Sequence, residues 1–159
     1  MDLAAIVRRL EFEDLHTAYA HCLDADELER WPDFFTPHCQ YRITTAENHA
    51  AGLPLGLMYA TSRDMLHDRV SALREANIYE PQTYRHLISS IRADKDDGEV
   101  VELTANFLVV RTMQEGDMSL FAAGRYIDRV VRADDGWKFD RKLVVLDSRQ
   151  IDTLLAIPL

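Results

Sequence analysis

The stretch YRHLISSIRADKDDGEVVELTANFLVVRTMQEGDMSLFAAGRYIDRVVRADDGWKFDRKLVVLD, residues 84–147, decides the fold. It divides into four extended segments, residues 84–93, 100–113, 118–133 and 137–147. The gaps between the segments each hold acidic residues with a glycine, at positions 96–98, 115–117 and 134–136. Such residues tolerate the positive φ that tight hairpin turns require. The stretch therefore predicts a long antiparallel meander.

The second segment indicates which residues face the core. Its apolar positions Val101, Leu103, Ala105, Phe107 and Val109 alternate with mostly polar ones. Successive side chains of a strand point to opposite faces of the sheet, so this period of two predicts one apolar face. The chain before the meander has to supply a cover for that face.

Helical patterns come first in the chain. Apolar residues recur at helical spacing over residues 2–23, which predicts one helix; a change of phase near Glu11 leaves a bend or a restart there open. Asp24 and Asp26 are suited to capping a second, shorter helix. Pro32 should interrupt this helix or start a new turn, because proline lacks the backbone donor.

Two short strands and a third helix are expected before the meander. The strands are predicted at residues 39–43 and 55–60, with a loop at 48–54 between them. A third helix should begin at the capping-box sequence of residues 61–64. Three N-terminal helices over one curved antiparallel sheet give an α+β fold.

The composition indicates one ordinary globular domain, residues 1–159. Apolar residues make up 47% and charged residues 28%, and no stretch rich in proline, glycine or serine marks a linker. A chain of this length can bury a single sufficient core. The net charge of −9 argues against nucleic acid and acidic membrane surfaces as partners, because binding phosphate needs clustered Lys and Arg.

Cysteine usage and hydropathy favour a cytoplasmic protein. Cys22 and Cys39 form neither a C-x-x-C pair nor a zinc-finger spacing, which favours reduced thiols over a disulfide. Charged residues near the N-terminus interrupt any signal-peptide core, and no apolar run approaches the roughly 20 residues of a membrane span.

One spacing imitates a metal site. Glu13, His16 and His21 resemble in type the carboxylate and two histidines of non-haem iron oxygenases. On a straight helix, however, residues five apart are separated by about 140° around the axis, so the two histidines cannot easily share one ion. We interpret the three as solvated helix-surface residues and expect no metal or cofactor in this chain.

A second group could perform acid–base chemistry. In a curved sheet capped by helices, Asp24, Tyr41, Tyr84 and His86 could meet at a cavity, where a histidine with an aspartate can act as a general base. The alternative is that Asp24 caps a helix and His86 is a hydrogen-bonded core or interface histidine. Catalysis by Asp24, Tyr41 and His86 is therefore the alternative interpretation, and no catalytic residue is expected in this chain.

Arginines in strands and an aliphatic tail suggest a subunit interface. The strand arginines are Arg85, Arg111, Arg125, Arg129 and Arg141, mingled with Asp128, Asp140 and Asp147. Solvated ion pairs would explain them, but arginine is also enriched at interfaces. The tail carries Leu154, Leu155, Ile157 and Leu159, and it should dock on its own sheet or on a partner. The expected interface residues are Arg85, Arg111, Arg125, Arg141, Leu154, Leu155, Ile157 and Leu159.

The order of several short motifs resembles a known family over almost the whole chain. The motifs are Leu23-Asp24 with Trp31 and Phe35, Tyr41-Arg42-Ile43, Asp64-Met65-Leu66 with Asp68-Arg69, Arg85-His86, Asn106-Phe107, Gly124-Arg125 with Asp128, and Arg141 with Leu146-Asp147. The chain resembles the small, or beta, subunits of Rieske non-haem iron aromatic-ring-hydroxylating dioxygenases, in particular those of terephthalate and benzoate systems.

The resemblance implies a cone-shaped α+β fold shared with nuclear transport factor two, scytalone dehydratase and ketosteroid isomerase. It also implies a catalytic, or alpha, subunit as partner, which holds the Rieske iron–sulfur cluster and the mononuclear iron. Three small subunits would form a trimer within a three-plus-three hexamer. This chain would then be a non-catalytic scaffold of an NADH-dependent system that dihydroxylates an aromatic carboxylate.

Two other functions are compatible with the sequence. One is a stand-alone cone-fold isomerase or dehydratase that uses His86 and Asp24, and the other is a small-molecule binding module without chemistry. A neighbouring gene for a subunit with the Cys-x-His and Cys-x-x-His cluster motif would favour the scaffold.

Overall fold

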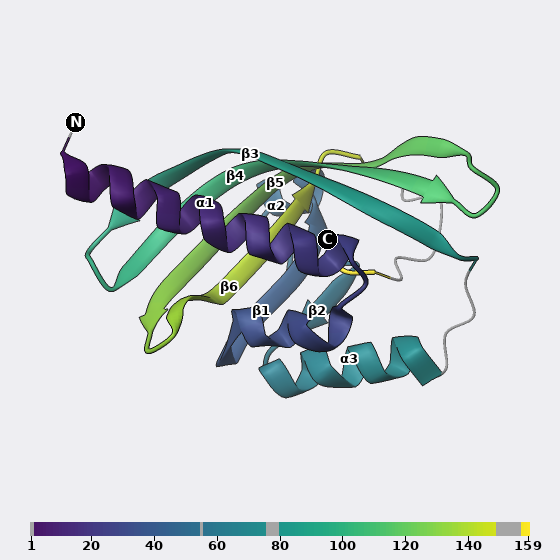
Figure 1. Cartoon of the computed structure of the whole chain (residues 1–159), viewed down its shortest axis with the longest axis horizontal. Helices are drawn as coiled ribbons and strands as arrows, with labels where there is room; N and C mark the ends of the chain where they lie inside the picture. Colours follow the sequence, from purple (N-terminus) through teal and green to yellow (C-terminus); the bar gives the residue numbers. More distant parts are fainter. Residues whose placement is uncertain (1, 55, 76–79, 149–156) are drawn as a thin grey trace.

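Helices occupy the first half of the chain and long strands the second half (Figure 1). The computed structural model describes residues 2–54, 56–75, 80–148 and 157–159. The elements are α1 (Leu3–Asp24), a 3₁₀ helix η1 (Leu28–Phe34), β1 (Phe35–Thr45), α2 (Ala46–Ala50), β2 (Met58–Ala60), α3 (Arg63–Glu75), β3 (Gln82–Asp96), β4 (Val100–Met113), β5 (Met118–Ala133) and β6 (Gly136–Leu146).

The last four strands form the predicted meander. β3, β4, β5 and β6 follow one another across the sheet, and each pairs antiparallel with the next. Gly98, Gly116 and Gly136 lie in the three turns with φ of 100°, 98° and 122°. Only glycine adopts such angles without strain, so these residues fix where the strands reverse. The meander prediction is confirmed, and β3 is longer at both ends than expected.

The first two strands extend the sheet beyond β6. The strand order is β2-β1-β6-β5-β4-β3, with β1 parallel to β6 and antiparallel to β2. One pair in this mainly antiparallel sheet is therefore parallel. Register shifts at Val109/Val110 and at Arg129/Val130 mark irregularities of the kind that bend strands. The sheet is curved and open (Figure 1).

The alternating apolar residues of β4 face the core. Val101, Leu103, Ala105, Phe107 and Val109 are each at most 4% exposed, as their period of two predicts. α1 packs along β3, and α3 packs against η1 and β1 (Figure 1). The α+β fold class, with helices covering one face of a curved sheet, is confirmed.

Aromatic side chains join the helices to the sheet. Tyr19 of α1 lies edge-on to Phe139 at 5.5 Å between ring centroids and to Phe35 at 6.4 Å. Trp31 of η1 lies edge-on to Tyr41 of β1 at 5.1 Å. Each such pair adds a directional contact to the burial of its rings.

The first helix is one continuous α-helix, as predicted, and it does not restart near Glu11. Its N-terminal apolar stripe is not part of the core, because Leu3, Val7 and Leu10 are 72%, 48% and 47% exposed. The phase changes because only the second half of α1, beginning near Phe12, packs with its apolar side on the sheet. Within the described part of the chain, no helix is long and apolar enough to cross a membrane.

The predicted capping of the second helix by Asp24 and Asp26 is wrong. The N-cap of η1 is Glu27, and it makes no side-chain capping hydrogen bond. Asp24 instead accepts hydrogen bonds from β3, and Asp26 pairs with Arg74 of α3 at 2.9 Å. Pro32 is the fifth of the seven residues of η1, and the helix continues past it to Phe34, so the proline does not end the helix.

The segment between β1 and α3 differs from the prediction in detail. Part of the predicted loop forms α2, whose first turn is capped by the Thr45 hydroxyl accepting from Asn48 N at 3.2 Å. β2 is shorter than predicted, and Leu55 lies outside the described residues. α3 begins at the predicted place, with the Ser62 hydroxyl accepting from Met65 N at 3.2 Å.

Candidate functional site

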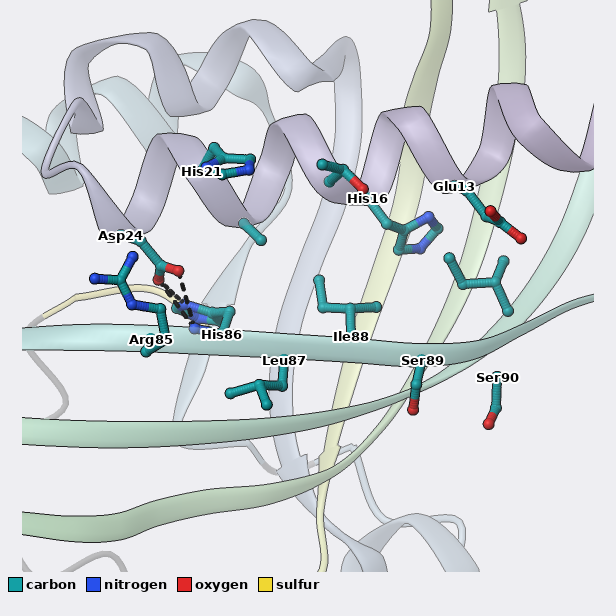
Figure 2. Close-up of a pocket in the computed structure, with 13 residues that line it drawn as sticks. Glu13, His16, His21, Asp24, Arg85, His86, Leu87, Ile88, Ser89 and Ser90 are labelled. Carbon is teal, nitrogen blue, oxygen red and sulfur yellow. Dashed lines mark hydrogen bonds and ion pairs between the residues drawn. The ribbon is translucent and has the colours of Figure 1, made fainter.

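A pocket of about 510 Å³ lies between α1 and the edge strand β3 (Figure 2). The residues that line it are Glu13, His16, Thr17, Ala20, His21 and Asp24 from α1 and Arg85, His86, Leu87, Ile88, Ser89, Ser90 and Ile91 from β3. Pockets that bind small molecules combine apolar walls with a few titratable groups in this way. The arrangement of those groups decides what the pocket can do.

Asp24 and His86 form a buried pair at one end of the pocket. His86 Nδ1 lies 2.6 Å from Asp24 Oδ1, and the His86 backbone N–H donates to both carboxylate oxygens at 3.1 and 3.0 Å (Figure 2). The His86 side chain is 0% exposed and the Asp24 side chain 7%. Asp24 is the last residue of α1, so this cluster of hydrogen bonds ties the end of the helix to the edge strand.

Tyr41 does not join this pair through a hydrogen bond among the described residues. Its hydroxyl donates to the carbonyl oxygen of Leu159 at 2.9 Å and accepts from Leu159 N at 3.1 Å. Tyr84 lies beside His86, with 6.1 Å between the ring centroids. Of the residues in the catalytic alternative, the structure joins Asp24 with His86 and directs Tyr41 to another part of the chain.

His16 belongs to a second buried group, which the sequence did not predict. Its Nδ1 lies 2.8 Å from the Phe12 carbonyl oxygen and its Nε2 lies 3.0 Å from Asp128 Oδ2. Lys142 Nζ lies 3.0 Å from the same oxygen. His16, Asp128 and Lys142 are each at most 1% exposed. The interpretation of His16 as solvated and of Asp128 as a surface ion-pair partner is therefore wrong.

Aromatic rings surround the Lys142 ammonium group. Nζ lies 3.6 Å from the ring centroid of Tyr126, 4.3 Å from that of Phe139 and 4.6 Å from that of Tyr19. Burial lowers the pKa of Lys142, and the Asp128 carboxylate opposes that shift. The three side chains are almost completely buried, and their hydrogen bonds join α1, β5 and β6, so we interpret the group as a structural cluster. Of the three, only His16 also lines the pocket between α1 and β3.

The apparent metal spacing of α1 does not produce a metal-binding geometry. Both ring nitrogens of His16 are engaged by Phe12 and Asp128, while His21 is exposed on the helix. Among the described residues, no group of three or more His, Cys, Asp or Glu is arranged to hold an ion. Glu13 interacts with Arg9 of its own helix at 3.4 Å.

Three of the expected interface arginines lie on the sheet face opposite the core. Arg85 pairs in register with Val110, and Arg125 pairs with Asn106; Val110 and Asn106 alternate with inward-facing residues of β4. Arg141 forms an ion pair of 2.8 Å with Glu102 on that face. Arg111 differs, because its guanidinium lies 4.7 Å from the ring centroid of Phe121.

The end of the chain lies inside the cone. Ile157 is 4% and Leu159 0% exposed, and the Leu159 carbonyl oxygen accepts from Tyr19 as well as from Tyr41. Leu154 and Leu155 lie outside the described residues.

Sequence reasoning missed the His16, Asp128 and Lys142 cluster and the buried position of Leu159 beside Tyr19 and Tyr41. One available signal was Lys142 at the start of an otherwise apolar run that ends at Leu146. A second was the spacing of Asp128, which lies two residues from Tyr126 and two from Val130 and so shares the face of β5 on which these two core residues lie.

Comparison with known proteins places the chain among oxygenase small subunits. The family model described as "Ring hydroxylating beta subunit" matches residues 18–153. Subunit beta 1 of the terminal oxygenase component of terephthalate 1,2-dioxygenase from Comamonas is 40% identical over 97% of this chain and 100% of its own length. The small subunit of anthranilate 1,2-dioxygenase from Burkholderia cepacia is 44% identical over 91% of this chain and 90% of its own.

Solved structures agree on the fold. A beta subunit assigned to an aromatic-ring-hydroxylating dioxygenase of Novosphingobium aromaticivorans superposes with a TM-score of 0.90 at 36% identity, over 98% of this chain and 99% of its own. A protein of the same organism assigned as a scytalone dehydratase gives a TM-score of 0.71 at 19% identity, over 96% and 93% of the two chains. The second likeness extends to the fold alone and supports the predicted scytalone dehydratase-like cone.

Proposed function

Because the chain belongs to the ring hydroxylating beta subunit family, we propose that it is the non-catalytic, structural subunit of a multicomponent dioxygenase. The observation that carries the proposal is the identity of 40% to a terephthalate dioxygenase beta subunit along the full length of that relative. The chain is thus a component of a ring-hydroxylating oxidoreductase. Its partner is a catalytic alpha subunit, which contributes the Rieske cluster and the mononuclear iron.

The side chains that fill the interior of the cone support a scaffold more than an independent enzyme. In a cone fold, the space between the helices and the sheet is where a substrate would have to bind. Here Leu159 and the His16, Asp128 and Lys142 cluster fill the part of that interior over β5 and β6, and all four are at most 1% exposed. The pocket that remains lies at the edge of the sheet, between α1 and β3. The Asp24–His86 pair is also buried, and the hydrogen bonds of the Asp24 carboxylate come from the backbone and the ring of His86.

The substrate class follows from the relatives. Terephthalate and anthranilate are both aromatic carboxylates, and the subunits of their dioxygenases are 40% and 44% identical to this chain. We assign an aromatic carboxylate as the substrate of the assembled enzyme, with electrons from NADH through a separate reductase in the cytoplasm.

The outer face of the sheet is the surface we assign to self-association, as a trimer within a three-plus-three hexamer. Arg85 and Arg125 lie on this face together with two exposed leucines, Leu87 at 50% and Leu120 at 76%. Arginine with apolar neighbours is typical of interfaces. Ile157 and Leu159 are buried in their own chain, so the arginine-bearing face is the better candidate.

Reconstitution with the catalytic subunit tests the function. The catalytic subunit is produced with and without this chain, the mass of the assembly is measured by light scattering, and turnover of terephthalate, benzoate and anthranilate is measured with reductase and NADH. We expect the two subunits to form a mixed assembly that turns over substrate, and the catalytic subunit without this chain to lack full assembly and activity. This chain alone should show no isomerase or dehydratase activity. Full assembly and activity of the catalytic subunit without this chain would contradict the proposal.

A further inference from the structure

Two tyrosine side chains bond to the backbone of Leu159, and a tryptophan side chain supports one of them. The hydroxyls of Tyr19 and Tyr41 donate to its carbonyl oxygen at 2.8 and 2.9 Å. Leu159 N donates back to the Tyr41 hydroxyl at 3.1 Å, and Trp31 Nε1 donates to the Tyr19 hydroxyl at 3.2 Å. We call Tyr19, Trp31 and Tyr41 the carbonyl cradle.

The cradle is built like a small-molecule site. Its three residues and Leu159 are fully buried, and Phe35 adds an apolar wall with its ring centroid 5.9 Å from that of Tyr41. A small number of oriented donors within aromatic walls is the usual design of a ligand pocket. The cradle holds the carbonyl group of Leu159, whose side chain is an isobutyl group.

The two hydroxyls stay protonated and so remain donors. Burial raises the pKa of Tyr41 and that of Tyr19. The positive charge of the half-buried Arg69 of α3 partly offsets the upward shift in the pKa of Tyr41. Two neutral donors near a cation favour an anionic acceptor.

The chain segment in the cradle is not part of the sheet. Residues 157–159 are in no strand, and both backbone polar groups of Leu159 bond to tyrosine hydroxyls. Because side chains hold the backbone of Leu159, another molecule that offers the same acceptor and the same apolar volume can replace it.

We propose that residues 157–159 fill a latent binding pocket, and that the vacated cradle takes a small apolar carboxylate. The carboxylate occupies the position of the Leu159 carbonyl group, and the apolar part occupies that of the leucine side chain. This site is separate from the pocket between α1 and β3, and it does not depend on the proposed function, because it lies within one chain.

The test uses the intact chain and a variant that lacks residues 157–159. Binding of 4-methylpentanoate and of the tripeptide Ile-Pro-Leu is measured by calorimetry, and the melting temperature is measured with and without each probe. We expect both probes to bind the shortened chain at one site and to raise its melting temperature. The intact chain should bind at least about 10-fold more weakly, because its own segment competes. Equal binding to both chains, or none to a folded shortened chain, overturns the proposal.

Conservative variants locate the binding. Tyr19→Phe and Tyr41→Phe in the shortened chain keep the rings and remove the donors, and together they should weaken 4-methylpentanoate binding by about 10-fold or more. Affinity that the two changes leave unaltered would overturn the assignment to the cradle. If the shortened chain folds only when the tripeptide is present, this rescue supports the proposal, provided that the two tyrosine changes abolish it. Failure of millimolar tripeptide to restore folding counts against the proposal.

Discussion

Lys142 Nζ lies 3.0 Å from Asp128 Oδ2, and neither side chain is more than 1% exposed. His16 Nε2 approaches the same carboxylate oxygen at 3.0 Å. One carboxylate thus connects two basic groups from α1 and β6 in the middle of the core. The cost of burying a charge is large unless it is paired, so this carboxylate should control the stability of the fold.

Removing the charge of Asp128 should destabilise the protein strongly. Asp128→Asn keeps the shape of the side chain but leaves the Lys142 ammonium group buried without a counter-charge. We expect the free energy of unfolding to fall by about 3–5 kcal/mol, as is typical when one partner of a buried pair is removed. Urea denaturation followed by circular dichroism measures the change.

A surface pair provides the matched control. Glu102→Gln removes the carboxylate opposite Arg141, a pair whose side chains are 32% and 39% exposed. Such a pair contributes about 0–1 kcal/mol. Similar losses for the two variants would show that burial of the Asp128 cluster has no special energetic role.

The stability of the protein should fall at high pH because of Tyr19 and Tyr41. Burial raises the pKa of both groups in the folded chain, whereas the unfolded chain releases these protons near pH 10. Above about pH 10 the folded state therefore holds more protons, and the free energy of unfolding decreases by up to about 1.4 kcal/mol per pH unit for each tyrosine. Urea titrations between pH 8 and 11 measure the slope.

The variant Tyr19→Phe with Tyr41→Phe isolates this contribution. Burial lowers the pKa of Lys142, so its contribution changes with the opposite sign and increases as the pH rises toward 10.5. Lys142 is present in both proteins and cancels in the comparison. A double variant with the same slope as the parent would contradict the prediction.

The two cysteines should be inert in the folded protein. Cys22 and Cys39 are 4% and 0% exposed, and burial raises the pKa of each thiol to about 11. Alkylation requires an accessible thiolate. Iodoacetamide at pH 7.5 should leave the intact mass unchanged over a period in which the urea-unfolded protein gains two carbamidomethyl groups. Rapid labelling of the native protein would place a thiol at the surface.

Local patterns predicted the meander, and non-local pairings explain what they missed. The turns at Gly98, Gly116 and Gly136 and the alternation in β4 depend on residues close in sequence, so the sequence alone was sufficient for them. The parallel pairing of β1 with β6 joins residues about a hundred positions apart. No periodicity within either strand carries that information.

The same limit applies to the candidate site. Asp24 and His86 were correctly grouped, because the expected cavity lies between the first helix and the start of the meander. Tyr41 was grouped with them wrongly, since its partner Leu159 is 118 residues away in the tail. Lys142 looks like a surface residue by type, and only the register of β5 with β6, Asp128 opposite Lys142, shows that it has a buried counter-ion.

The outer face of the sheet should be needed for self-association. Leu87→Glu with Leu120→Glu places two charges on a face that we assign to an interface, where an unpaired charge is costly. We expect the mass measured by light scattering at tens of micromolar to fall to that of the monomer, with the melting temperature nearly unchanged, because surface changes alter stability by only about 0.5 kcal/mol.

Exposed leucines on the first helix provide the control for this surface. Leu3→Glu with Leu10→Glu changes side chains that are 72% and 47% exposed, similar to the 50% and 76% of Leu87 and Leu120. This control should retain the mass of the parent. A monomeric parent, or equal dissociation of both variants, would remove the sheet face from consideration.

Variants of the Asp24–His86 pair distinguish a scaffold function from a catalytic one. A general base is worth about 10²–10⁴ in turnover, so His86→Ala would lower the turnover of an intact assembly by that factor if His86 took part in chemistry. The geometry predicts a different result, because Asp24 accepts three hydrogen bonds from His86 and the histidine side chain has no exposed surface. His86→Ala and Asp24→Asn should each lower the free energy of unfolding by about 1–3 kcal/mol, the cost of unpaired buried groups.

Turnover per assembled complex, measured after size exclusion with saturating iron and reductase, should stay within a few-fold of the parent for both variants. A hundredfold loss in a complex that remains intact would mean that the pair contacts the reacting substrate, and it would contradict the scaffold function.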